Sequence, residues 1–573
     1  MLVLVLVSTA SAAFSIHRGK SLEAMLNLLA ITGLFLAAAV CVRGPPMLRG
    51  LAFFQVLAAL PVAALGILQH FRPELLPAAN SYPGRALGPF GQPNRMGGYI
   101  VASIPVALAL AFSAQDRVLK TGLLLATFGL VFCLIVTYSR GAWIGLGAGL
   151  LILAAAFLRW PELLPRPAIL AAALAALAVP VLFLLPSILA RVEARPSTAP
   201  AWNLPIDPER EGSGAMRRAI WSGALDAALR RPVIGNGIGT FREAFDRAKS
   251  PVMKQLEAEG GRTADQAHNH YLGLLAERGA LGLAAFAVLT ALMFGAAATA
   301  MASGTPAMGR VLVAGLAGSV GALLVHGLVD DNLSLVPHGT LLFANLGLLA
   351  AAPADRGDAR RSPWTGRALI FLALVGLAVS TASFAGSRAA EAASVDMRFR
   401  RAQRAVADYA TASRLAPWRD DFAVDHAVAA EASRAYREAE AAYRQAIAVN
   451  GSDPVTRQQL ARLYLAHPGI WGDEGAAKAL EQLKLALAQN PYYAEIQNDL
   501  GVALLRAGNR EEARAAFGRA AQGRKEFVDP LLNLAALAIE SGDSVEARSW
   551  LTRALERDPG SVRARALLAR LSQ

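Results

Sequence analysis

Apolar residues form runs of about 20 before residue 387 and alternate with charged residues after it. A run of that length is what one membrane-spanning helix requires. The pattern predicts an all-α protein, in which a polytopic membrane helix bundle precedes a soluble α-solenoid. The eleven expected spans are 1–16, 23–42, 48–70, 96–114, 119–138, 141–158, 167–190, 269–300, 308–328, 338–353 and 366–386.

Four regions follow from this pattern. The N-terminal membrane helices occupy residues 1–190, and a polar loop with amphipathic helices occupies residues 191–267. Further membrane helices occupy residues 268–387, and the repeats occupy residues 388–573. The apolar N-terminus lacks the basic start of a signal peptide, so we expect it to be a first membrane helix.

Basic residues in the short loops predict the orientation of the bundle. Five loops on alternate connections carry them, and such loops face the cytoplasm. Only the stretch 17–20 is basic on the opposite side. That side receives the loop 71–95, the turn 138–141, the segment 191–267 and the repeats. The basic loop residues are Arg43, Arg49, Arg117, Lys120, Arg159, Arg166, Arg310, Arg356, Arg360, Arg361 and Arg367.

Small and large residues recur in the C-terminal region with a period of about 34 residues, the length of a tetratricopeptide repeat. About five repeats have this pattern, and one carries an insertion around 467–472. Such repeats stack into a solenoid with a concave surface, which suggests binding of a protein partner. A spacing or stabilising role is the alternative. The recurring sets are Ala405, Tyr409, Ala412; Ala439, Tyr443, Ala446; Ala479, Leu483, Ala486; Ala513, Phe517, Ala520; and Ala547, Leu551, Ala554.

Composition narrows the choice of partners. Hydrophobic residues make up 54% of the chain, the net charge is +13, and no aromatic residues are interleaved with the basic ones. Nucleic acid is therefore not an expected partner, whereas lipid head groups and pyrophosphate are. Cys41 and Cys133 lie in different apolar runs, so neither a disulfide nor a cysteine metal site is expected.

His268 stands where the polar loop gives way to an apolar run. If Asp265 caps the helix, His268 lies in its first turn, where the helix dipole keeps an imidazole neutral, as a general base requires. A capping or interfacial histidine is the alternative. Asn269 is a candidate substrate contact, and His270 and Glu277 are expected to have supporting or structural roles.

Several arginines are expected on the same face as His268. Arg140 opens a helix, Arg217 and Arg218 begin an amphipathic helix, and Arg85 precedes a glycine-rich turn that ends at Asn94. Arginine binds phosphate through bidentate hydrogen bonds, so these residues suit a lipid-linked pyrophosphate. Head-group anchoring or salt bridges are the alternatives.

Other chemistry has little support. The turn 232–241 is rich in glycine but lacks the Lys-Ser/Thr of a phosphate loop, which favours a tight turn over a nucleotide site. His326, Asp330 and Asp331 form a weak metal candidate that we interpret as structural. We therefore expect neither a metal nor a cofactor.

His268-Asn269, Gly279 and Gly282 together resemble the signature of the O-antigen ligase and polymerase superfamily. The stretches 88–94, 139–143, 217–221 and 232–241 resemble that superfamily in its order, and the likeness spans about 80–350. Tetratricopeptide repeats after the last span resemble one of its subgroups. Twelve spans are common there, so a further N-terminal helix is possible.

The resemblance implies a metal-independent, inverting glycosyltransferase of the GT-C type in the bacterial inner membrane. Such enzymes move a glycan from undecaprenyl pyrophosphate to an acceptor on the periplasmic side. By motif position, His268 would activate the acceptor, and Arg140 and Arg217, or Arg218 in its place, would hold the pyrophosphate.

Four functions fit these patterns. The first is a ligase of lipid-linked glycan, and the second is a polymerase that extends it. Transfer to Ser or Thr of a protein is the third. The fourth is a membrane scaffold without catalytic activity, which recruits glycan-assembly proteins through its repeats.

Overall fold

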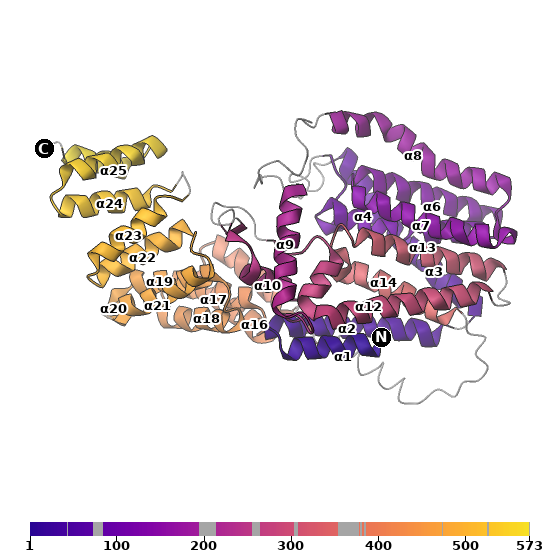
Figure 1. Cartoon of the computed structure of the whole chain (residues 1–573), viewed down its shortest axis with the longest axis horizontal. Helices are drawn as coiled ribbons and strands as arrows, with labels where there is room; N and C mark the ends of the chain where they lie inside the picture. Colours follow the sequence, from indigo (N-terminus) through magenta and orange to yellow (C-terminus); the bar gives the residue numbers. More distant parts are fainter. Residues whose placement is uncertain are drawn as a thin grey trace.

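The computed structural model describes residues 1–42, 44–72, 84–193, 214–251, 253–254, 264–302, 307–352, 378, 381–382, 385–472, 474–523 and 527–571. Its elements are helices, and no strand occurs in these ranges. The apolar half and the repeats lie end to end along the long axis (Figure 1). The all-α prediction of a helix bundle followed by a solenoid is confirmed.

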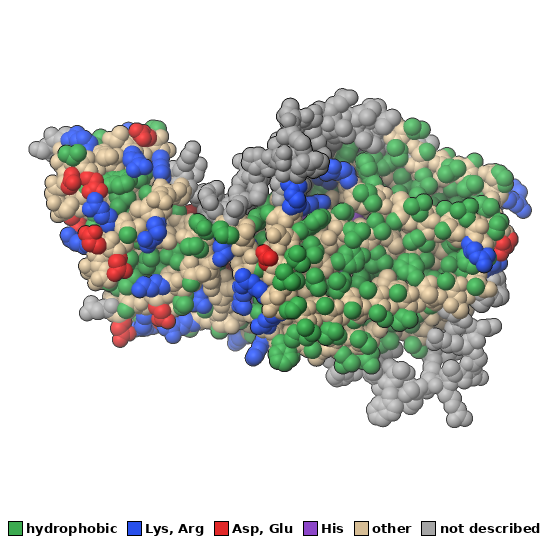
Figure 2. Space-filling model, in the orientation of Figure 1, with side chains coloured by type: hydrophobic (Ala, Val, Ile, Leu, Met, Phe, Trp, Pro, Cys, Tyr) green, Lys and Arg blue, Asp and Glu red, His purple; other side chains and the backbone are tan. Residues whose placement is uncertain are grey.

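Seven helical segments are long and apolar enough to cross a membrane, and three apolar helices are shorter. Hydrophobic side chains cover the visible flank of this bundle, whereas charged ones gather at its ends and on the repeats (Figure 2). The chain is therefore a multi-pass membrane protein. The long segments are α2 (Arg18–Cys41), α3 (Gly44–Phe71), α4–α5 (Pro93–Ser113), α6 (Arg117–Val136), α7 (Arg140–Arg159), α12 (His270–Ala302) and α13 (Met308–His326).

The remaining spans differ in detail from the expectation. The shorter helices α1 (Leu2–Ala13) and α14 (Val336–Ala351) match the first and tenth predicted spans. Helix α8 (Pro167–Glu193) matches the seventh, and its part Pro167–Ala178 is the third of the shorter apolar helices. Most of the eleventh predicted span, 366–386, lies outside the described residues.

The predicted span 96–114 is two helices, not one. Helix α4 (Pro93–Val101) ends at Ala102, and α5 (Ile104–Ser113) begins after Ser103. Pro105 lies in the first turn of α5, where its missing N–H costs nothing, whereas it would disrupt a continuous helix. Sequence hydropathy alone does not detect such a break.

Small residues let the central helices approach closely. A Cβ atom built on Gly149 of α7 would lie 2.7 Å from the carbonyl oxygen of Gly318 in α13, and the converse distance is also 2.7 Å. Glycine contacts of this kind are typical of packed membrane helices, which lack a hydrophobic driving force between them. They place the ends of α7 and α13 side by side.

Two helices outside the bundle are joined by the glycine-rich turn. Helix α9 (Gly214–Arg230) and α10 (Phe241–Ala248) flank residues 231–240, and this turn packs against α12. Figure 1 shows α9 standing across the end of the bundle. The expected tight turn is present, and it packs against a break in a membrane helix.

Helix α12 is broken at Gly279, whose φ of +66° is rare for residues with a side chain. The turn supplies the hydrogen bonds that the break removes: the Ala280 amide donates to the Pro232 carbonyl at 2.7 Å, and the Gly237 amide donates to that of Glu277 at 2.9 Å. Asn236 adds a side-chain bond to the Ala276 carbonyl at 2.9 Å. The element that packs against Gly279 is therefore this turn.

The repeats confirm the small–large–small pattern. Each predicted alanine and each large residue between two alanines is buried, with Tyr409 the most exposed at 6%. The insertion forms the short helix α20, whose Trp471 packs edge-on against Tyr464. The helices are α16 (Ala402–Leu415), α17 (Asp420–Ala432), α18 (Tyr436–Val449), α19 (Pro454–Ala466), α20 (Pro468–Trp471), α21 (Glu474–Gln489), α22 (Ala494–Arg506), α23 (Arg510–Ala520), α24 (Asp529–Glu540), α25 (Ser544–Arg557) and α26 (Val562–Arg570).

The N-terminal end of α2 joins the two halves. A Cβ atom on Gly19 would lie 2.8 Å from the Trp418 carbonyl oxygen, so α2 touches the repeats there. Lys20 pairs with the buried Glu243 of α10 at 2.5 Å. This pairing explains why 17–20 is basic against the loop pattern, because a charge neutralised within the protein no longer reports on membrane orientation.

The exchange of hydrogen bonds at the break makes Gly279→Ala destabilising. A Cβ atom there would lie 2.3 Å from the Val233 carbonyl oxygen and would occupy a left-handed backbone, so we expect a loss of about 1–3 kcal/mol. Thermal unfolding of the purified protein in detergent measures it. Gly295→Ala in the same helix is the control, because its Cβ atom meets nothing within 4 Å. Equal midpoints for both variants would contradict the role of the turn.

Candidate functional site

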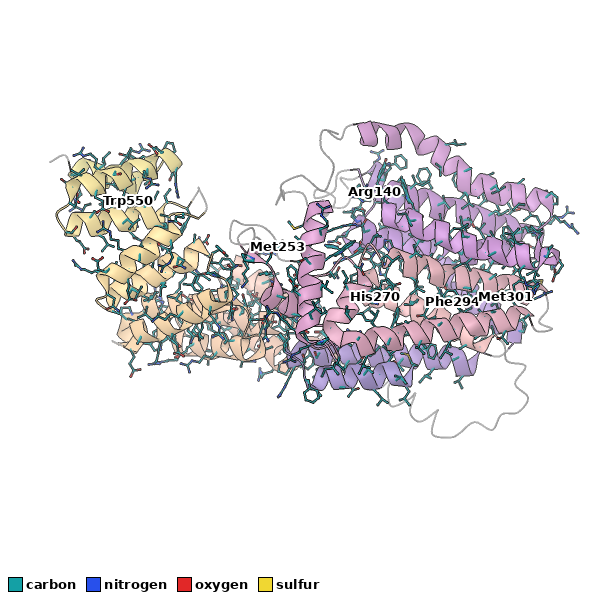
Figure 3. The ribbon with its side chains drawn as sticks, viewed as in Figure 1. Arg140, Met253, His270, Phe294, Met301 and Trp550 are labelled. Atoms are coloured by element: carbon teal, nitrogen blue, oxygen red, sulfur yellow. The ribbon has the colours of Figure 1, made fainter. Side chains whose placement is uncertain are left out.

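Polar segments from distant parts of the chain meet at the end of the bundle that faces the repeats. Arg140, at the start of α7, and His270, at the start of α12, both lie at this end (Figure 3). The predicted convergence of the turn 138–141, the long loop and the histidine motif on one face is therefore observed.

His268 lies two residues before the start of α12 and has a left-handed backbone, with φ of +48°. Its half-buried ring turns Nδ1 toward the buried Asp330, with 3.6 Å between Nδ1 and Oδ1, which is longer than a hydrogen bond. Strained non-glycine residues cluster at functional sites. With Nδ1 facing a carboxylate, Nε2 is the nitrogen left to accept a proton from a substrate.

Asp330 carries the negative charge of this pair. Burial favours its protonated form, but the neighbouring His268 and His326 rings and the Asp331 amide outweigh that effect. The pKa of the Asp330 carboxyl therefore lies below its ordinary value, and the group is ionised at neutral pH. A carboxylate in that state orients an imidazole and stabilises its protonated form.

A second His–Asp pair lies beside the first and is closed. His270 Nδ1 is 2.8 Å from Asp331 Oδ1, and Ser334 donates to the same oxygen at 2.6 Å. The backbone amide of His270 donates to the Gly327 carbonyl at 2.8 Å. This buried pair fastens the start of α12 to the segment after α13, in agreement with the supporting role expected for His270.

Asn269, and not Asp265, caps α12. Its side-chain oxygen accepts hydrogen bonds from the amides of Tyr271 at 3.0 Å and Leu272 at 3.1 Å. Asp265 instead pairs with Arg242 at 3.3 Å on the surface. The prediction that His268 occupies the first turn was wrong, because the helix begins two residues later.

His326 connects the pair to a predicted arginine. Its buried ring interacts electrostatically with both Asp330 and Arg217. Arg217 is half-buried in the first turn of α9, and its buried Nε has no hydrogen-bond partner among the residues that the structure describes. Two glycines leave room for the imidazole of His326: a Cβ atom on Gly98 would lie 2.8 Å from its Cε1, and one on Gly141 would lie 3.1 Å from its Cδ2.

Arg140 is the first residue of α7, with its side chain exposed. It follows a strained turn, since Tyr138 has φ of +52°. Arg85 holds this turn: its Nε donates to the Thr137 carbonyl at 2.9 Å, and its Nη2 donates to the Tyr138 carbonyl at 3.3 Å. The structure thus gives Arg85 a role in positioning Arg140, whereas we predicted a substrate contact.

The other two candidates lie at the edges of the cluster. Arg218 is exposed, whereas its neighbour Arg217 is half-buried, and its charge acts on the buried His326 ring. Asn94 lies in the first turn of α4, and its carbonyl accepts a hydrogen bond from Asn332 at 3.0 Å. That contact ties α4 to the segment that carries Asp330.

Comparison with known families finds a match in each half of the chain. Residues 125–287 match the family model described as O-antigen ligase, and residues 504–571 match a tetratricopeptide-repeat model. The chain is therefore similar to O-antigen ligases over part of its membrane half, and tetratricopeptide repeats follow. The first match contains Arg140, Arg217, His268 and Gly279, so the predicted resemblance is confirmed, although the stretch 88–94 lies outside the matched residues.

Solved structures resemble this O-antigen ligase-like chain over about a third of its length. The repeat protein YrrB is 18% identical, covers 31% of this chain and 89% of its own, and has a TM-score of 0.26. PilF of Pseudomonas aeruginosa is 16% identical, covers 34% of this chain and 85% of its own, and has a TM-score of 0.29. A search among curated proteins finds no match.

Sequence reasoning did not assign Asp330 and His326 to the site. We interpreted them, together with Asp331, as a structural group. In the structure the two adjacent aspartates point to different sides, and each side holds a histidine: Asp330 faces His268 and Asp331 faces His270. The alternation of His268 and His270 with two consecutive aspartates was the available signal.

The closed pair predicts a stability effect for Asp331→Ala. This change leaves His270 buried without its carboxylate, and breaking a buried pair costs about 3–5 kcal/mol. Thermal unfolding in detergent measures the loss. Asp265→Ala is the matched control, since its pair with Arg242 is exposed and contributes little. A midpoint for Asp331→Ala as high as that of the control would show that the pair does not hold α12.

Proposed function

We propose that the protein is a glycosyltransferase that moves a glycan from undecaprenyl pyrophosphate to an acceptor hydroxyl, as an O-antigen ligase does. The observation that carries this proposal is the grouping of His268, Asp330, His326 and Arg217 at the end of the bundle. The family match supports the same chemistry, because its residues include both the histidine and the arginines.

His268 is the acceptor-activating base in this proposal. Asp330 faces its Nδ1 and stabilises the imidazolium that forms when Nε2 takes the hydroxyl proton. The contact of His270 with Asp331 and the cap by Asn269 fix the start of α12. They thereby hold the His268 ring at this end of the helix. Positioning of this kind lowers the entropic barrier between base and acceptor.

Arg140 and Arg217 are the pyrophosphate ligands. A guanidinium keeps its charge at any physiological pH and fits two phosphate oxygens at once. Within the described part of the chain the buried Nε of Arg217 has no hydrogen-bond partner, and a phosphate oxygen would supply one. Two such residues neutralise the charge that accumulates on the leaving group.

The reaction balances with these groups alone. The acceptor oxygen forms a bond to the anomeric carbon while the bond from that carbon to the pyrophosphate oxygen breaks, which inverts the configuration. The hydroxyl proton passes to His268, and the electron pair of the broken bond stays on undecaprenyl pyrophosphate beside the arginines. This account needs no metal or cofactor.

The location follows from the proposed substrate. We place the site and the repeats on the periplasmic side of the bacterial inner membrane, since the basic loop residues Arg159 and Arg310 lie at the ends of α7 and α13 opposite to Arg140 and His326. The acceptor, a lipid, glycan or protein, would reach the site from that side. The repeats would bind a protein partner.

Loss of the imidazole tests the catalytic assignment. His268→Ala should lower transfer by about 10²–10⁴, the contribution of a general base. Transfer is measured with purified protein and lipid-linked glycan. His426→Ala, in the repeats, is the matched control and should leave transfer unchanged. Wild-type activity of folded His268→Ala protein would contradict the proposed function and favour a scaffold.

Neighbouring arginines test the pyrophosphate site. Arg217→Gln should lower transfer by about 10–10³, because one charge-stabilising group is lost, whereas Arg218→Gln should have little effect. Arg140→Gln should lower transfer as Arg217→Gln does. Arg159→Gln, at the other end of α7, should have as little effect as Arg218→Gln. The same transfer assay applies. Equal activity of the Arg217 and Arg218 variants would refute the assignment.

The species that accumulates in cells without the protein distinguishes the two related activities. Long glycan on its lipid carrier indicates a ligase, whereas single repeat units on the carrier indicate a polymerase. The ligase is the proposed function, so we expect the long form, detected by lipid extraction and electrophoresis.

A further inference from the structure

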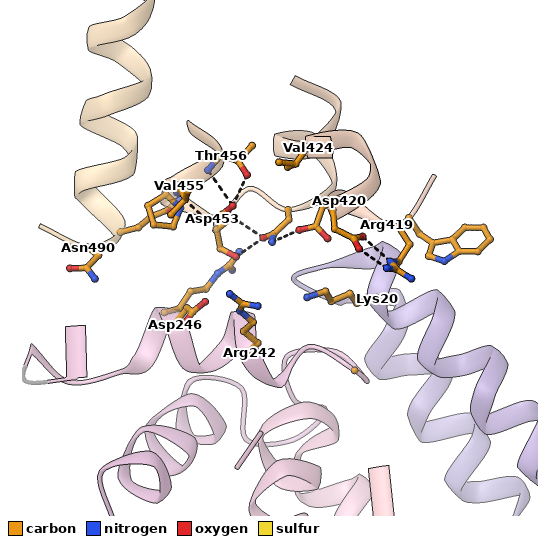
Figure 4. A pocket seen from close by; sticks show the side chains of 18 of the residues that line it. Lys20, Arg242, Asp246, Arg419, Asp420, Val424, Asp453, Val455, Thr456 and Asn490 are labelled. Atoms are coloured by element: carbon orange, nitrogen blue, oxygen red, sulfur yellow. Dashed lines mark hydrogen bonds and ion pairs between the residues drawn. The ribbon is translucent and has the colours of Figure 1, made fainter. Parts of the chain in front are cut away.

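A cavity of 1030 Å³ lies between the membrane half and the repeats, apart from the candidate catalytic cluster. Its floor is the start of α2 together with α10, and its roof is formed by the first turns of α17 and α19 and the end of α21. Figure 4 shows Lys20 and Arg242 on one side of it and Asp420 and Asp453 on the other. At this volume it is at the upper end of the range of small-molecule sites, which extends to about 1,000 Å³.

The two walls carry opposite charges. Six cationic side chains line the membrane side, with two acidic ones among them, whereas four aspartates and one arginine line the repeat side. The cations are Lys20, Arg230, Arg242, Arg247, Lys249 and Lys254. The aspartates are Asp420, Asp421, Asp425 and Asp453.

This balance selects the chemistry of a ligand. A polyanion would lie beside the aspartates, and a polycation would lie beside the lysines and arginines. Repulsion between like charges would make the binding of either ligand less favourable. A hydroxyl group both donates and accepts, so it can donate to a carboxylate on one wall and accept from a guanidinium on the other. Trp418 and Tyr493 add ring surface to the lining, and Asn450, Gln459 and Gln489 add amides.

The position of the cavity connects it to the candidate site. Arg242 follows Phe241, whose backbone amide donates to the Glu277 carboxylate of α12 at 3.2 Å. Helix α10, which lines the cavity, is thus hydrogen-bonded to α12, and α12 begins two residues after His268.

We propose that the cavity binds an oligosaccharide segment of the donor glycan, through uncharged hydroxyl groups. This inference rests on the proposed function, of which it defines a substrate subsite. The repeats then serve as one wall of a sugar site in addition to any protein partner.

A bulky side chain on the repeat wall tests the subsite. Ala488 is exposed at the end of α21 and lines the cavity, so Ala488→Trp fills space without altering a polar group. Ala515→Trp, exposed on α23 and not part of this lining, is the matched control. The full-length protein in nanodiscs is titrated with glycan released from its lipid carrier by mild acid, and binding is followed by saturation-transfer NMR.

We expect Ala488→Trp to weaken glycan binding at least about tenfold and Ala515→Trp to leave it unchanged. Titration with inorganic pyrophosphate separates the two proposals: Ala488→Trp should keep pyrophosphate binding, whereas Arg217→Gln should lose it and keep the glycan. No glycan binding by the wild-type protein, or equal binding by both tryptophan variants, would overturn the subsite. Intact glycan binding with unchanged transfer in His268→Ala would instead refute only the proposed function.

Discussion

The break of α12 at Gly279 is the constraint on which the functional end of the molecule depends. A membrane helix with a break must satisfy its exposed backbone groups, because the hydrocarbon offers no hydrogen bonds. Here the turn 232–241 satisfies them. The Ala280 amide donates a hydrogen bond to the Pro232 carbonyl, and the Gly237 amide donates one to the Glu277 carbonyl. The short segment before the break is thereby held apart from the long apolar one and presents the histidines to the polar loops.

Two carboxylates, Asp330 and Asp331, each face one histidine near the start of this helix. The pair of His270 and Asp331 is short and buried, and it fixes the helix in place. The pair of His268 and Asp330 is longer, partly exposed and strained in its backbone. In the proposed function, this difference leaves the imidazole of His268 able to meet a substrate, whereas His270 holds the helix.

Much of the fold was predictable from periodicity. The membrane spans follow from apolar runs, and the solenoid follows from recurring alanines that are buried wherever the pattern placed them. The break before Pro105 and the cap by Asn269 were missed, since each depends on one residue inside an otherwise regular run. Boundaries of the four regions stay predictions.

The candidate site was less accessible to sequence reasoning. Spacing identified His268, Arg140 and Arg217, but the roles of Asp330 and Arg85 depend on contacts between residues far apart in the chain. A cryo-EM map of the protein with bound undecaprenyl pyrophosphate tests the central claim most directly. Our account predicts diphosphate density between Arg140 and Arg217, near His268. Density at the opposite end of the bundle, beside Arg159 and Arg310, would contradict it.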